Sequence, residues 1–256
     1  MMKRNWISFT SLARKEMIRI FRIWIQTLVP PMITITLYFI IFGGFIGSQL
    51  GDIGGYDYMA FIAPGLIMMA IITNSYSNTV ASFFSTKFQR NIEELLVSPT
   101  PSWVIILGYI SGGMTRGLCV GMLVSLIALI FAKLPLYNIT FIFLFAFLTS
   151  FVFSLAGMIN GIFAKKFDDI SIIPTFVITP LTYLGGVFYS ISLLPDFWHT
   201  LSRINPIVYM ISGFRYGFLG ISDINVWTGL GMLVLFSVVL FLITLTLLEK
   251  GVGVRD

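Results

Sequence analysis

The stretch INVWTGLGMLVLFSVVLFLITLTLL, residues 224–248, lies between Asp223 and Glu249 and contains no charged residue. A helix needs about 20 predominantly apolar residues to cross the roughly 30 Å of hydrocarbon in a bilayer, so this stretch predicts a transmembrane helix. Four other charge-free intervals also exceed this requirement, and they separate Arg22 from Asp52, Asp57 from Lys87, Lys133 from Lys165, and Asp169 from Asp196.

The composition agrees with this prediction, because 57% of the residues are hydrophobic and only 11% are charged, against about 25% charged in a soluble domain. A sixth interval, from Glu94 to Lys133, is interrupted only by Arg116. Barrel strands would give short alternating segments instead, so we expect an all-α integral membrane protein with one domain over residues 1–256. The six predicted spans are residues 25–47, 58–82, 104–132, 139–163, 171–190 and 226–248.

Basic residues are distributed unevenly between the two sides of this topology. With six spans, 12 of the 16 Lys and Arg residues lie on the side that holds both termini, and three lie opposite. Because cytoplasmic loops carry an excess of Lys and Arg, we expect both termini in the cytoplasm. The net charge of +5 is therefore a topology signal, and it does not indicate nucleic-acid binding.

Two segments outside the spans have distinctive patterns. Residues 4–24 place apolar residues at intervals of three and four opposite a basic side, which is typical of an amphipathic helix in the membrane interface; a simple basic tail is the alternative. The apolar residues are Trp6, Phe9, Ala13, Met17, Ile20 and Trp24. Residues 191–222 are too apolar for a free loop, and Ile207 to Gly220 is too short to cross the membrane. Two re-entrant half-helices on the outer side fit this segment.

Residues 84–102 predict a short cytoplasmic helix that ends at Pro99 and Pro101. The segment combines charges with a small apolar face, and a solvated loop would not need that face. We expect the helix to rest in a groove of a partner protein and to couple the two proteins. The residues proposed for this contact are Phe88, Arg90, Asn91, Ile92, Glu93, Glu94, Leu95 and Leu96.

Polar and small residues within the spans form two further candidate sets. Polar side chains at membrane depth should face protein or water, so they are candidates for either helix packing or a translocation path. These residues are Asn74, Asn78, Arg116 and Asn160. Small residues allow helices to approach closely, either within one subunit or in a dimer. These residues are Gly43, Gly47, Gly117 and Gly121.

Several kinds of chemistry are absent from the sequence. A Gly-Lys dipeptide does not occur, which excludes a P-loop for ATP, and one His and one Cys residue exclude a paired His zinc site and an internal disulfide. We expect no catalytic, cofactor or metal site in this chain. Carboxylates are also missing from the predicted spans, whereas ion-coupled carriers usually need them. The energy source is therefore expected to be a partner protein.

Three segments resemble the type-2 ABC transporter permeases of bacterial inner membranes: RNIEELLVSP (residues 90–99), PLTYLGGVFY (residues 180–189) and NPIVYMISGFRYG (residues 205–217). The resemblance covers almost the whole chain. It implies six spans with a connecting helix and two re-entrant half-helices, and a homodimer with two separate ATPase subunits that bind ATP and Mg. It also implies export by alternating access. A stand-alone secondary carrier or channel is the alternative function.

Overall fold

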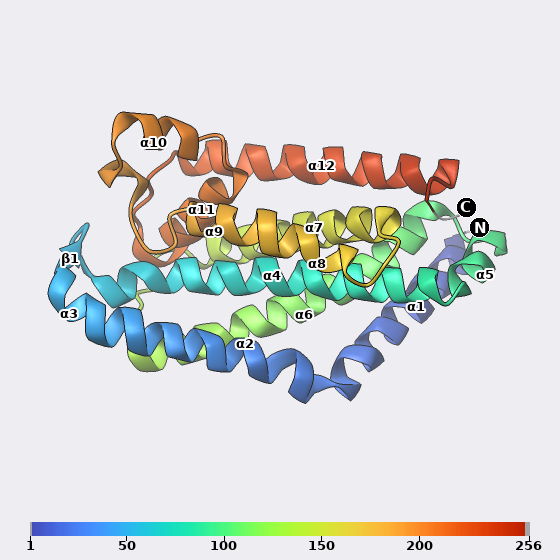
Figure 1. The fold of residues 1–256 in the computed structure, drawn as a ribbon, viewed down its shortest axis with the longest axis horizontal. Coiled ribbons are helices and arrows are strands. Elements are labelled where there is room, and N and C mark those ends of the chain that lie inside the picture. The colour runs from blue at the N-terminus through green and yellow to red at the C-terminus, as the bar shows by residue number, and fades with distance from the viewer. Residues whose placement is uncertain (1, 254–256) are drawn as a thin grey trace.

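The computed structural model describes residues 2–253, which form an elongated bundle of helices (Figure 1). The first half of the chain contains α1 (Met2–Arg22), α2 (Trp24–Tyr38), the π-helix η1 (Phe39–Ile46), α3 (Gly47–Leu50), β1 (Asp52–Ile53), β2 (Tyr56–Asp57), α4 (Tyr58–Phe88), α5 (Asn91–Val97) and α6 (Ser102–Phe131). The second half contains α7 (Ile139–Phe163), α8 (Asp169–Ile173), the π-helix η2 (Pro174–Ile178), α9 (Thr179–Tyr183), η3 (Ile191–Leu193), α10 (Asp196–Ser202), α11 (Pro206–Leu219) and α12 (Val226–Lys250).

The two ends of the bundle differ in what they contain (Figure 1). One end holds α5 and the ends of α1 and α12 nearest the termini, and we call it the terminal end. The other end holds the β1–β2 hairpin, α10 and α11, and we call it the far end. This arrangement places residues from the start and the close of the chain next to the short helix α5.

Among the described residues, five helical segments are long and apolar enough to cross a membrane. They are Trp24–Phe45, Tyr58–Phe88, Ser102–Phe131, Ile139–Phe163 and Val226–Lys250. Their bounds are close to five of the six predicted spans, and the prediction of an all-α integral membrane protein is confirmed. The remaining predicted span, residues 171–190, has a different structure.

That segment begins as a helix and loses its regular structure before its predicted end. The consecutive elements α8, η2 and α9 are helical only as far as Tyr183, and Pro174 and Pro180 lie near the starts of η2 and α9. Residues 184–190 are irregular, yet Gly185, Gly186 and Val187 are buried. This buried irregular segment lies at the far end, between α9 and η3.

The central element is α4, which packs against both α6 and α7 along its length. Of its most apolar window, 83% is buried inside the protein, against 17–44% for the other four candidate spans. The apolar core surrounds the half of α4 nearer the far end, including Ile62, Leu66 and Ile67. Because the other spans expose most of their apolar side chains to the surroundings, lipid solvates them while α4 is solvated mainly by protein.

The face of α1 that contacts the protein was only partly predicted. Leu12, Glu16 and Ile20 are buried, and α1 packs against α6. Trp6 and Trp24, which the sequence pattern placed on the same face as Ile20, are exposed. Ile20 of the predicted apolar face is therefore covered by the protein, and the position of the helix in the membrane interface stays a prediction.

Candidate interaction surface at the terminal end

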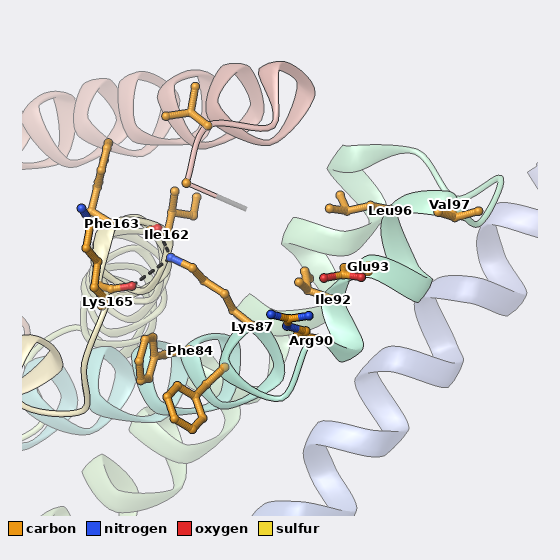
Figure 2. Close-up of a pocket in the computed structure, with 14 residues that line it drawn as sticks. Phe84, Lys87, Arg90, Ile92, Glu93, Leu96, Val97, Ile162, Phe163 and Lys165 are labelled. Carbon is orange, nitrogen blue, oxygen red and sulfur yellow. Dashed lines mark hydrogen bonds between the residues drawn. The ribbon is translucent and has the colours of Figure 1, made fainter. Parts of the chain in front are cut away.

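A hollow of about 1100 Å³ lies between the ends of α4, α5 and α7 and the turn after α12 (Figure 2). Its lining combines charged side chains, including Arg90, Glu93 and Lys165, with apolar ones, including Leu96 and Val97. The volume exceeds that of a usual small-molecule pocket, about 300–1000 Å³. An open hollow of mixed polarity at the surface is typical of a protein contact.

Lys87 connects the last turn of α4 to the end of α7 by hydrogen bonds. Its Nζ donates hydrogen bonds to the carbonyl oxygens of Ile162 and Ala164, the latter at 2.9 Å (Figure 2). Carbonyl groups in the last turn of a helix lack intrahelical partners, and a cationic side chain satisfies them well. The wall of the hollow is therefore fixed by a contact between two of its helices.

The connection from α4 to α5 is a tight turn with a left-handed residue. Arg90 has a φ of 61°, and it is the one non-glycine residue with positive φ among those the structure describes. The Arg90 amide donates to the Lys87 carbonyl at 2.9 Å, and the Glu93 amide donates to the Arg90 carbonyl at 3.1 Å. Such a conformation is unfavourable for a non-glycine residue, so the turn is maintained by its surroundings.

The apolar face of α5 is occupied by the chain itself. Ile92 is 1% exposed and belongs to a core cluster with Phe83, Ile105 and Ile106. Leu95 and Leu96, also named as contacts for a partner, are partly buried against the same cluster. The prediction that this face fills a groove of a partner is therefore wrong for Ile92, which anchors α5 to its own subunit.

The opposite face of α5 remains accessible. The predicted contact residues Arg90, Asn91, Glu93 and Glu94 are all exposed. Val97 is 87% exposed at the end of the helix. The structure thus divides the predicted coupling set into a buried anchor and an exposed charged face.

An aromatic cluster borders this face. Phe88 and Phe167 are 59% and 52% exposed, and their ring centroids are 5.0 Å apart. Phe84, which is buried, contacts Phe167 edge-on at the same distance. Phe167 comes from the loop between α7 and α8, and the sequence reasoning did not connect it with Phe88. Aromatic residues are enriched in protein interfaces, and the rims of these interfaces are polar.

The polar residues predicted within the spans all make bonds inside the chain. Asn78 accepts a hydrogen bond from Arg19 at 2.9 Å, and Asn74 donates to the Ala70 carbonyl at 2.9 Å. The longer contacts are from Asn160 to the Ile170 carbonyl at 3.4 Å and from Arg116 to the Thr27 carbonyl at 3.5 Å. These contacts favour helix packing over direct lining of a path.

One accessible stripe remains on α4. Along the half of α4 nearer the terminal end, Thr73, Ser77, Ala81 and Ser85 are partly exposed, while the residues between them are all buried. A spacing of four residues places them on one side of the helix. Sequence reasoning missed this stripe because it selected asparagines for their polarity, whereas exposure of the smaller hydroxyl residues depends on how neighbouring helices pack.

The sequence reasoning also missed Glu16, which is 1% exposed. Its carboxylate accepts hydrogen bonds from Ser82 at 2.6 Å and from Arg19 at 2.8 Å. Gly112 of α6 lies against it, since a Cβ there would come within 2.9 Å of the Glu16 Oε2. Glu16 therefore joins α1 to both α4 and α6.

The four predicted glycines lie at close approaches within one subunit. A Cβ at Gly117 or Gly121 would collide with Ser75 or Ile71 of α4. A Cβ at Gly43 would collide with Met59, and a Cβ at Gly47 would make a tight contact with Tyr58 at 3.3 Å. The structure places all four at packing contacts inside the chain.

The helical bundle and its lipid-solvated spans define an integral membrane protein with an exposed surface at its terminal end. Residues 7–219 match the ABC-2 type transporter family, and the chain belongs to that family. The resemblance of its three sequence segments to type-2 ABC permeases is thereby confirmed.

Named relatives align with nearly the full chain. The inner membrane transport permease YadH of Escherichia coli (strain K12) is 60% identical over 256 residues, which is all of both chains. Nodulation protein J of Neorhizobium galegae is 24% identical over 249 residues, covering 97% of this chain and 91% of the relative. The same protein of Rhizobium leguminosarum bv. trifolii is 25% identical over the same length.

Proposed function

We propose that this chain is the permease subunit of an ATP-driven exporter and that a separate cassette ATPase docks on α5 and the hollow beside it. The observation that carries the proposal is the division of α5. Ile92 holds the helix on the core of its own subunit, while Glu93 and Glu94 face outward. A helix that is anchored to its own subunit and has an accessible charged face is suited to transmit a conformational change from a partner.

The missing nucleotide site supports the same proposal. Without a P-loop in the sequence, ATP and Mg would be bound by the partner subunit. Export by alternating access would then require the permease to rearrange when the partner closes. A homodimer with two ATPase subunits is the assembly we propose.

The terminal end is the side that we place in the cytoplasm. Basic residues concentrate there, as expected for the cytoplasmic side, and the name of the Escherichia coli relative supports the inner membrane as the location. A reporter that is active only outside the cytoplasm, fused after Asp256, should be inactive. Activity of this fusion would contradict the orientation.

The path for the cargo is proposed along the accessible stripe of α4. Thr73, Ser77 and Ser85 present hydroxyl groups on the central helix, and polar groups at this depth should face protein or water. Replacing Ser77 with Leu should block export without releasing the ATPase. Replacing Leu126, which is 51% exposed on α6, with Phe is the matched control and should have no effect.

Docking is tested by reversing charges on α5. Glu93→Arg together with Glu94→Arg should detach the ATPase or uncouple its hydrolysis, because like charges placed against a complementary surface cost several kcal/mol. The reversal Asp196→Arg, at an exposed position on α10 at the far end, is the control. Co-purification with the co-expressed cassette ATPase and ATP turnover are the measurements.

The outcome separates the two functions considered. If the double reversal co-purifies and hydrolyses ATP like the parent, α5 is not the coupling element. If the parent itself associates with no cassette ATPase and transports without ATP, the stand-alone carrier is the correct function. Insertion into the membrane should be unchanged in both variants, since the substituted side chains are exposed and surface ion pairs contribute only about 0–1 kcal/mol to stability.

A further inference from the structure

Residues 184–190 form an irregular segment that is packed inside the far end of the bundle. Val187 is fully buried, and a Cβ at Gly65 of α4 would come within 2.9 Å of the Val187 backbone. Irregular backbone is tolerated beside a membrane only where protein satisfies its polar groups. The groups that satisfy this segment therefore determine whether it stays in place.

Side chains from other elements bind three carbonyl groups in and just before the segment. Arg215 Nη2 donates to the Gly186 carbonyl at 2.5 Å, and the Tyr58 hydroxyl donates to the Phe188 carbonyl at 3.1 Å. Asn205 Nδ2 donates to the carbonyl of Leu181, in α9, at 2.6 Å. The backbone is thus secured from three directions instead of by a helical ladder.

Arg215 is the most deeply buried of these donors. Its side chain is 2% exposed, and its Nη1 lies 3.1 Å from Asp223 Oδ2. The guanidinium carbon lies 4.0 Å above the centroid of the Phe61 ring on α4, within range of a cation–π interaction. Arg215 therefore links the irregular segment, α4 and the loop before α12.

Asp223 contacts the segment a second time. Its Oδ1 accepts a short hydrogen bond from the Ser190 hydroxyl. Arg215 and Asp223 thus bind the segment by hydrogen bonds at Gly186 and at Ser190. A hollow of about 240 Å³ borders this pair and is lined by Leu193, Ser190 and both ionised residues. Space for the segment to move therefore exists next to its attachment.

We propose that Arg215 and Asp223 form a latch that positions residues 184–190 against α4 and so closes the far end of the permease. Arg215 is a positioning residue in this latch, because it acts through the backbone of Gly186 and not on cargo. The latch is separate from ATPase docking, since it lies at the opposite end of the molecule. Its release would uncover the part of α4 that Val187 covers.

The test uses one engineered thiol in the purified full chain in detergent, without an ATPase. The substitution Cys119→Ala removes the native thiol, and Val187→Cys introduces a side chain close in size to the one it replaces. In this background the new thiol at position 187 should react slowly with a water-soluble maleimide, because Val187 is buried. Adding Arg215→Met should speed the reaction at least tenfold, and Arg215→Lys should give an intermediate rate.

A second thiol distinguishes local release from general unfolding. Thr149 of α7 is fully buried, and the thiol of Thr149→Cys should remain slow to react when Arg215→Met is added. Equal rates for the thiol at position 187 with and without Arg215 would overturn the latch. Simultaneous acceleration at both positions would also overturn it, because Arg215 would then support the whole bundle. Neither result depends on the docking proposed for α5.

Discussion

Two ion pairs, one toward each end of the bundle, are built in opposite ways. Toward the terminal end, Glu16 is buried and its partner Arg19 is 31% exposed, and both belong to α1. At the far end, Arg215 is buried and its partner Asp223 is 13% exposed, and the pair joins α11 to the loop before α12. The first pair lies within one helix, whereas the second connects separate elements.

The difference indicates what each end can do. Around Glu16, regular helices α1, α4 and α6 are packed directly, with Leu12 against Gly108 and Ser82 bonded to Glu16. A contact between Ser8 and Thr100, at 3.3 Å, adds the segment after α5. The terminal end is therefore held together by direct packing of regular helices, while the far end depends on a few side chains that hold irregular backbone.

The substitution with the largest expected effect tests the ion pair between Arg215 and Asp223 at the far end. Asp223→Ala leaves the buried Arg215 guanidinium without its carboxylate partner. Loss of one partner of a buried ion pair typically lowers the free energy of unfolding by about 3–5 kcal/mol. The thermal unfolding midpoint in detergent should fall clearly. The control Asp196→Ala removes an exposed acid of α10 and should leave the midpoint unchanged. A similar midpoint for both variants would remove the distinction between the two ends.

The substitution with the next largest effect tests the packing of α1 against α6 at the terminal end. Gly112→Val introduces a Cβ within 2.8 Å of the Glu16 Cβ, and overpacking of this kind costs about 1–3 kcal/mol. Gly231→Val is the matched control, because no neighbouring atom lies within 4 Å of a Cβ there. Denaturant unfolding compares the two variants. Equal stability would mean that α1 shifts freely on α6.

A smaller effect tests the hydrogen bond to the buried acid. Ser82→Ala removes one donor to the Glu16 carboxylate, and an unsatisfied buried acceptor costs about 1–2 kcal/mol here, since Arg19 remains. Ser85→Ala changes a partly exposed serine one turn away and serves as the control. Equal unfolding free energies for the two would show that Glu16 does not need Ser82.

The smallest effect concerns pH. Backbone amides of Lys165 and Lys166 donate to the exposed Asp169 carboxylate and hold its pKa below the ordinary value of 3.8. A lowered folded pKa stabilises the protein above the ordinary value, and this contribution is lost as the pH falls through the folded pKa. The difference in unfolding midpoint between parent and Asp169→Ala should be present at pH 7 and shrink below about pH 3.8. A constant difference would exclude this contribution.

The spans could be predicted because the membrane imposes one simple requirement. Charge-free intervals located four of the five long apolar segments, including Ile139–Phe163 at its observed bounds, and the interval interrupted by Arg116 located the fifth, Ser102–Phe131. The segment 171–190 satisfied the same requirement, but its helix stops at Tyr183. Hydropathy measures transfer into lipid and does not register that Arg215, Tyr58 and Asn205 can replace the helical hydrogen bonds.

The candidate site was predicted only in part for a related reason. The pattern of α5 showed an apolar face, and Ile92 does occupy a hydrophobic core. The apolar residues around Ile92 could come from the same chain or from a partner protein. They come from the same chain because the tertiary fold brings Phe83 and Ile105 to α5. Glu16 was missed likewise, because its burial requires Gly112 to lie beside it on α6.

The close approach of α4 to Gly117 has a mechanical consequence. Ser75 meets Gly117 between the two ends of α4; at 1.5 Å per residue, Phe88 lies about 20 Å to one side and Gly65 about 15 Å to the other. A tilt about this contact makes the helix a lever with arms of about 20 Å and 15 Å. A displacement of about 4 Å beside α5 would then move Gly65 by about 3 Å, which is enough to part it from Val187.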